Sequence, residues 1–219
     1  MPDGNVALTR AYAQARADII AERFGIAGPK VDLTNTRSLT AHVSTTSAHI
    51  WVSRYGLARL SKNGLDALLA HELAHVAQRR DGYPAPPQRR VLLSVVLISF
   101  VVSFVLAVLE ELTGAGSGLP VTAATGVLAA SGTWLIASDM AWSRARERDA
   151  DRRAVAVVGS AAWSALIADN QRALRWYERA AYAVIPPFLN SHPSLRSRRR
   201  LTETAETRTA VLRSHKPSC

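Results

Sequence analysis

Two long apolar stretches divide the chain into three parts. The first, Val91–Leu109, contains no charged residue; with a rise of about 1.5 Å per residue, a helix over it would measure roughly 28 Å, close to the thickness of a hydrocarbon core. The second, Leu119–Ser138, is also uncharged but richer in Ala, Gly and Thr. The pattern predicts two transmembrane helices joined by a short loop, the alternative for each being a buried helix of a soluble protein.

The segments around these stretches have the mixed pattern of an α+β domain. Residues 5–24 carry apolar side chains at helical spacing, and Gly25 provides a stop. The Thr- and Val-rich region that follows predicts two or three short strands, separated by polar turns, at Val31–Thr34, Leu39–Ser44 and His49–Ser53.

Further helices are expected on both sides of the apolar stretches. One should start at Asn63, as N-cap, and run to about Arg80, where a Pro-rich segment stops it. After the second apolar stretch we expect helices over residues 144–158, 161–183 and 193–212. The predicted fold class is therefore mainly α with a small β-sheet.

The charge of the chain is placed around the apolar stretches. Lys and Arg number 27 against 17 Asp and Glu, a net charge of +10. Arginines precede the first stretch and follow the second, whereas residues 110–118 hold two acids and no base. By the positive-inside rule both chain ends face the cytoplasm of a two-span protein of the cell membrane. The lipid bilayer accounts for the basic flanks, so no nucleic-acid partner is expected.

Cysteine content and the N-terminus exclude other classes. Cys219 is the single cysteine, so no intrachain disulfide can form. Charged residues interrupt residues 1–30, which therefore do not read as a signal peptide.

The motif that indicates chemistry is His71-Glu72-Leu73-Ala74-His75, an HExxH sequence inside the predicted helix from Asn63. Residues four apart share one face of a helix, so both imidazoles can reach one ion. Zn²⁺ accepts two such nitrogens, an acid as third protein ligand and a water, and Glu72 is placed to take a proton from that water. The alternative is a helix with ordinary polar histidines.

A third ligand is available downstream. Glu147 and Asp151 lie four residues apart on a predicted helix. Glu147 could complete the coordination of one zinc ion, and Asp151 could accept a proton from a ligand imidazole and fix its tautomer. An ordinary charged helix beside a membrane span is the alternative.

The order of these features resembles the HtpX-type membrane zinc metallopeptidases, relatives of the CAAX prenyl endopeptidases. The resemblance rests on HELAH, two apolar stretches, Glu147-xxx-Asp151 and His192-Pro193, and on the run Ile50–Val76. It covers roughly residues 40–200. It implies that His71, His75 and Glu147 bind zinc and that Glu72 is the catalytic base. It also implies that His192 faces the scissile carbonyl and that Asp151 and Arg198 support the site.

These observations together predict a zincin-like catalytic domain interrupted by a transmembrane hairpin. Residues 1–90 would hold the N-terminal helix, the sheet and the HExxH helix; residues 91–138 the hairpin; and residues 139–219 the Glu-bearing helix and the rest of the catalytic domain. Glu147 follows Ser138 by roughly 13 Å of helix, which places the active site near the cytoplasmic membrane surface.

The predicted function is a membrane-embedded, zinc-dependent endopeptidase that cuts membrane-associated proteins or peptides, with a role in membrane protein quality control. One alternative is a protease dedicated to a small membrane-tethered peptide. Another is a non-enzymatic basic protein that binds membrane surfaces or nucleic acid. The chain departs from the resembled family in having no span before the HExxH helix, and residues 1–30 match no known pattern.

Overall fold

The computed structural model describes residues 8–37, 39–83, 88–114, 119–173, 197–201 and 203. They fall into two compact units. The first contains the helices α1, α2, α3 and α6, a β-sheet, residues 197–201 and 203, and the part of α5 from Arg146 onward. The second contains α4 and the part of α5 up to Ala145.

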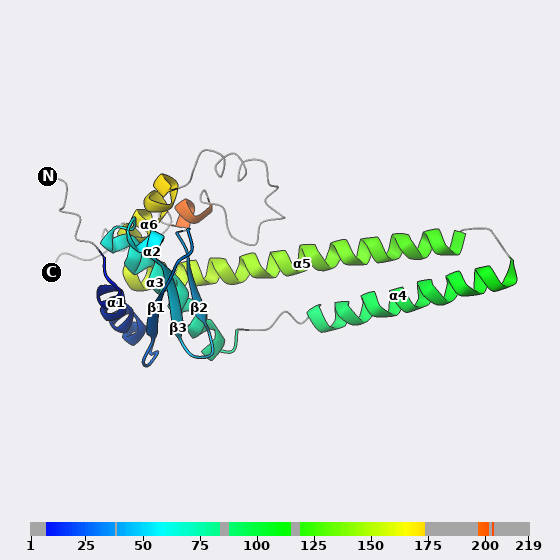
Figure 1. Cartoon of the computed structure of the whole chain (residues 1–219), viewed down its shortest axis with the longest axis horizontal. Coiled ribbons are helices and arrows are strands. Elements are labelled where there is room, and N and C mark those ends of the chain that lie inside the picture. The colour runs from blue at the N-terminus through cyan, green and yellow to red at the C-terminus, as the bar shows by residue number, and fades with distance from the viewer. Residues whose placement is uncertain are drawn as a thin grey trace, which may run out of the picture. The chain divides into compact units, whose positions relative to one another are not determined.

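The first unit begins with one helix and a three-stranded sheet (Figure 1). Helix α1 spans Arg10–Arg23, β1 spans Lys30–Thr34, β2 spans Ala41–Ser44 and β3 spans His49–Ser53. The strand order is β1-β3-β2, with β1 parallel and β2 antiparallel to β3. All three predicted strands are confirmed, and β2 is an edge strand.

Alternation of side chains gives the sheet one buried face. Val31, Val43, Ile50 and Val52 are buried, and they belong to a core that also includes residues of α1 and α3. The α1 helix packs against both α3 and β1. The N-terminal helix thus covers the sheet and supports the helix that carries HExxH.

Helix α3 spans Lys62–Arg80 and follows the short helix α2, Arg54–Leu57. Its N-cap is Ser61, whose hydroxyl accepts from the Gly64 N–H, so the prediction of Asn63 as the cap was wrong. Ser61 is held in the N-cap position by Asp169 of α6, whose carboxylate accepts from both the backbone N–H and the hydroxyl of Ser61. Nearly all of α3 from Gly64 to Gln78 is buried.

Two further helices complete the first unit. The prediction that the helix carrying Glu147 reaches Val158 is confirmed, because α5 spans Leu119–Val158. Helix α6 spans Ser160–Ala173 and packs along α3. Residues 174–196 lie outside the described part, and so does most of the predicted last helix, of which 197–201 and 203 are helical.

The second unit consists of α4, Gln88–Thr113, and the first part of α5 (Figure 1). Among the described residues, one helical segment, Ser94–Thr113, is long and apolar enough to cross a membrane. The second predicted span lies in α5; its helical structure is confirmed, and its membrane crossing stays a prediction.

Candidate metal centre

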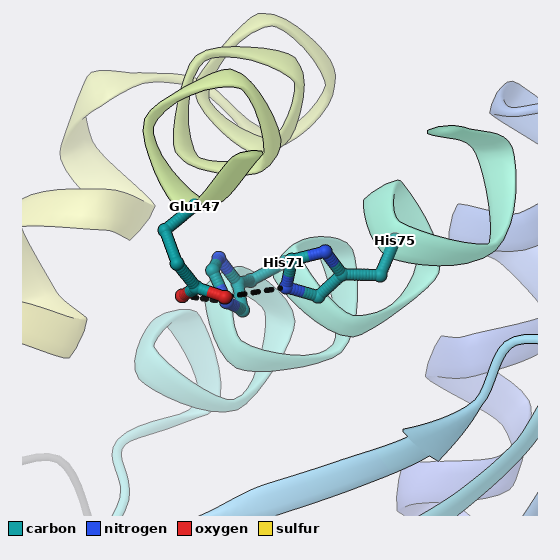
Figure 2. Close-up of side chains that lie close together, drawn as sticks. All are labelled: His71, His75 and Glu147. Atoms are coloured by element: carbon teal, nitrogen blue, oxygen red, sulfur yellow. Dashed lines mark ion pairs between the residues drawn. The ribbon is translucent and has the colours of Figure 1, made fainter. Parts of the chain in front are cut away.

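The centre is built from side chains of two helices that are far apart in the sequence. His71 and His75 lie one turn apart on α3, and Glu147 lies on α5. All three are buried. Figure 2 shows both imidazoles directed at the Glu147 carboxylate. The spacing therefore predicted a real convergence of these three residues.

The distances suit a tetrahedral metal ion. His71 Nε2 lies 3.4 Å from one oxygen of Glu147, and His75 Nε2 lies 3.2 Å from the other. Zinc bonds of about 2.0–2.1 Å in a tetrahedron separate neighbouring ligand atoms by about 3.3 Å. One ligand atom from each residue lies within 4.8 Å of the others, so the group could hold a metal ion.

The contacts of the two imidazoles also determine which ring nitrogen is free to bind a metal ion. His71 Nδ1 lies 2.9 Å from Asp151 Oδ1, and His75 Nδ1 lies 2.9 Å from Gln78 Oε1. With both Nδ1 atoms facing oxygen acceptors, each neutral ring keeps its lone pair on Nε2, which faces Glu147. This donor set, two imidazole nitrogens and a carboxylate with a buried second layer, fits zinc.

Opposing effects act on the pKa of His71 in the metal-free protein. Burial lowers this pKa, but hydrogen bonding to Asp151 and Glu147 outweighs burial and raises it to about 9. The site thus favours positive charge at the position where a cation would bind.

Arg198 lies beside the carboxylates of the centre, and its role in supporting the site stays a prediction. Its Nε is 3.1 Å from Asp151 Oδ2, and its Nη2 is 3.6 Å from Glu147 Oε2. Trp163, fully buried on α6, lies against both the His71 ring and the Arg198 guanidinium. The four carboxylate oxygens of Asp151 and Glu147 therefore face His71, His75 and Arg198.

The roles of two other predicted site residues, Glu72 and His192, stay predictions. Glu72 is buried on α3 beside His71, and its role as base stays a prediction. His192 lies outside the described residues.

Three residues with clear structural roles escaped the sequence analysis. Gln78 follows His75 by three positions, a spacing that places both on one face of α3 and was available as a signal. Asp149, between Glu147 and Asp151, holds Gln78 in turn. Asp169 could not have been found, since its contact with Ser61 joins positions far apart in the chain.

Comparison with known proteins identifies the family. The comparisons with curated proteins and with solved structures gave no match. The sequence model of peptidase family M48 matches residues 7–205, nearly the whole chain. The match extends to the N-terminal segment, for which the sequence alone suggested no relative. The chain therefore belongs to peptidase family M48 and is a zinc-dependent metalloendopeptidase.

Proposed function

We propose that this M48 peptidase is embedded in the cell membrane and cuts membrane-associated proteins or peptides near the cytoplasmic face, in membrane protein quality control. The observation that carries the proposal is the surface of α4. Large apolar side chains are exposed over a broad face of this helix: Leu97, Ile98, Phe100, Val101, Phe104 and Leu109. An exposed apolar face this wide needs an apolar surrounding, and a bilayer provides one.

In this proposal His71, His75 and Glu147 bind the zinc ion. When bound, zinc polarises the scissile carbonyl and makes the attacking water more acidic. Glu72 accepts the proton of that water and delivers it to the leaving amine. Arg198 partly neutralises Glu147 and Asp151, so these carboxylates can lie together in a buried site.

The substrate would pair with β2. This strand is at the edge of the sheet and packs against α3, the helix that carries HExxH. Backbone pairing along an edge strand holds an extended peptide without requiring a particular sequence. Such binding suits an enzyme that removes diverse damaged proteins. His192, as a donor to the oxyanion, stays a prediction about a residue outside the described part.

Membership of a peptidase family argues against the non-enzymatic binder. The dedicated processing enzyme differs from the quality-control enzyme in its range of substrates. Purified full-length protein in liposomes should cut several unrelated unfolded membrane proteins; cleavage of one small tethered peptide alone would identify a dedicated enzyme instead.

The membrane setting is tested with one cleavable peptide in two forms, one soluble and one fused to a transmembrane segment. The proposal expects faster turnover of the anchored form in liposomes. Glu72→Gln serves as the inactive control and should retain zinc. Equal turnover of both forms would contradict a membrane-restricted enzyme, and full activity of Glu72→Gln would contradict the assigned base.

A further inference from the structure

Gln78 occupies an unusual position beside the metal centre. It is almost fully buried, at 2 % exposure, one turn beyond His75 on α3. Three hydrogen bonds fix its amide group. The Nε2 group donates to the backbone carbonyl of Arg146 at 2.8 Å and to Asp149 Oδ2 at 2.9 Å, and Oε1 lies 2.9 Å from His75 Nδ1.

These partners allow one orientation of the amide. A carbonyl and a carboxylate only accept hydrogen bonds, so the NH₂ group must face Arg146 and Asp149. Rotating the amide by half a turn would bring oxygen against oxygen at both contacts. The amide oxygen therefore faces His75, and His75 Nδ1 must carry the hydrogen, which leaves the lone pair of the neutral ring on Nε2.

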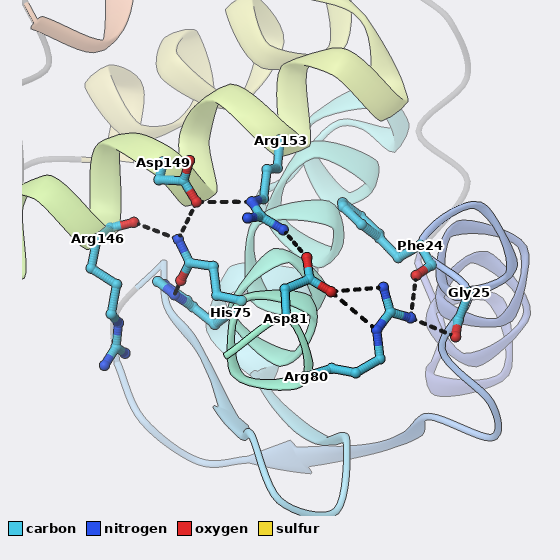
Figure 3. A network of polar contacts seen from close by, with 9 residues as sticks. Phe24, Gly25, His75, Arg80, Asp81, Arg146, Asp149 and Arg153 are labelled. Carbon is cyan, nitrogen blue, oxygen red and sulfur yellow. Dashed lines mark hydrogen bonds and ion pairs between the residues drawn. The ribbon is translucent and has the colours of Figure 1, made fainter. Parts of the chain in front are cut away.

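The orientation is itself supported from further away. Arg153 Nε donates to the same Asp149 oxygen at 2.8 Å, and Arg153 Nη1 pairs with Asp81 at the end of α3. Arg80, next to Asp81, donates to the carbonyls of Phe24 and Gly25 after α1. Figure 3 shows this connected series of contacts from His75 to the end of α1.

We propose that Gln78, held by Asp149 and the Arg146 carbonyl, is a positioning residue that fixes the tautomer and ring orientation of His75 for metal binding. His71 has an anionic partner, Asp151, whereas His75 has a neutral amide fixed by α5. The Gln78 amide is hydrogen-bonded both to His75 and to the Arg146 carbonyl of α5, the helix that carries Glu147. It therefore fixes the His75 ring relative to the backbone beside Glu147. The proposal rests on the assignment of His75 as a zinc ligand.

The test measures zinc affinity of the full-length protein by competition with a chelator. Gln78→Met keeps the length of the side chain and removes all three hydrogen bonds. Loss of such a partner typically weakens metal binding about 10- to 100-fold, and we expect that loss here. The visible spectrum of the Co²⁺-substituted protein should shift as well, since the His75 ring is no longer held.

Gln14 provides a matched control. Its amide also makes three hydrogen bonds, to Asp18, to the Pro29 carbonyl and from the Val31 N–H, but it touches no ligand of the centre. Gln14→Met should lower thermal stability and leave both zinc affinity and the Co²⁺ spectrum unchanged. Equal affinity losses in Gln14→Met and Gln78→Met would show a general effect of lost structure and overturn the proposal.

The outcome also distinguishes the two proposals. If His75→Ala loses zinc while Gln78→Met binds it as tightly as wild type, the role of Gln78 is wrong and the ligand assignment stands. If His75→Ala retains wild-type affinity, zinc is bound elsewhere, and both proposals fail.

Discussion

Replacing Asp169 by Ala should strongly destabilise the protein, although this residue lies outside the metal centre. Asp169 is buried on α6, and its Oδ2 accepts from the Ser61 N–H at 2.8 Å and from the Ser61 hydroxyl at 2.7 Å. Ser61 caps α3. The variant therefore removes the contact that fixes the start of the zinc-binding helix against α6.

The expected loss in the free energy of unfolding follows from the contacts that Asp169 makes. Hydrogen bonds to a charged group are worth about 1.5–3 kcal/mol each, so losing the two that Ser61 donates should cost about 3–5 kcal/mol. Arg172 also pairs with Asp169, but its side chain is 73 % exposed, so that ion pair adds little. For a chain of this size, about 2–4 °C per kcal/mol gives a Tm lower by about 6–20 °C.

Thermal unfolding of the purified protein in detergent measures this shift, with Asp18→Ala as the control. Asp18 is exposed and accepts one hydrogen bond, from Gln14, so its removal should change the Tm by about 2 °C or less. Asp169→Asn keeps one acceptor oxygen and should fall between the two. A Tm for Asp169→Ala within 2 °C of wild type would refute the reasoning.

Four further predictions concern the first unit. Gly64→Ala should lower the Tm because its Cβ would overlap Asp169 Oδ2, whereas Gly126→Ala, with open space around it, should not; similar unfolding curves would contradict this. Zinc must displace a proton from His71, whose raised pKa is about 9 in the metal-free protein, so chelator competition should show affinity rising about tenfold per pH unit up to about pH 9. The same raised pKa stabilises the metal-free fold fully below about pH 6.5, and thermal unfolding should show that contribution disappearing as the pH approaches 9. Arg198→Gln should tighten zinc binding by up to about tenfold, because it removes a positive charge beside Glu147; weaker binding by calorimetry would point to a structural role instead.

Local patterns predicted most of the elements that carry the centre. The β-strands follow from short Thr- and Val-rich runs between turns, and the one-turn spacing of His71 and His75 defines a shared helix face. Glu147 could be chosen because a zinc site needs an acid and because Asp151 follows at helical spacing. Each of these inferences uses residues within a few positions of one another.

Apart from the convergence of Glu147 with the two histidines, inferences that depend on distant partners failed or were never made. Asn63 has the side chain of a good N-cap, but Ser61 takes that place because Asp169 holds it. Gln78 looks like any polar residue near the end of a helix until Asp149 and the Arg146 carbonyl are brought to it. Tertiary contacts, rather than local preference, decide such positions.

The contacts at the two ends of α3 explain how ligands on either side of a long apolar insertion can form one site. At the start of α3, Asp169 from α6 holds Ser61. At its end, Asp81 pairs at 2.6 Å with Arg153, which lies about 1.7 turns beyond Glu147 on α5. Because α3 is fixed at both ends to elements that follow the insertion, the distance between its histidines and Glu147 is set within the first unit. Changes in the length of α4 should therefore affect where the enzyme acts more than whether it binds zinc.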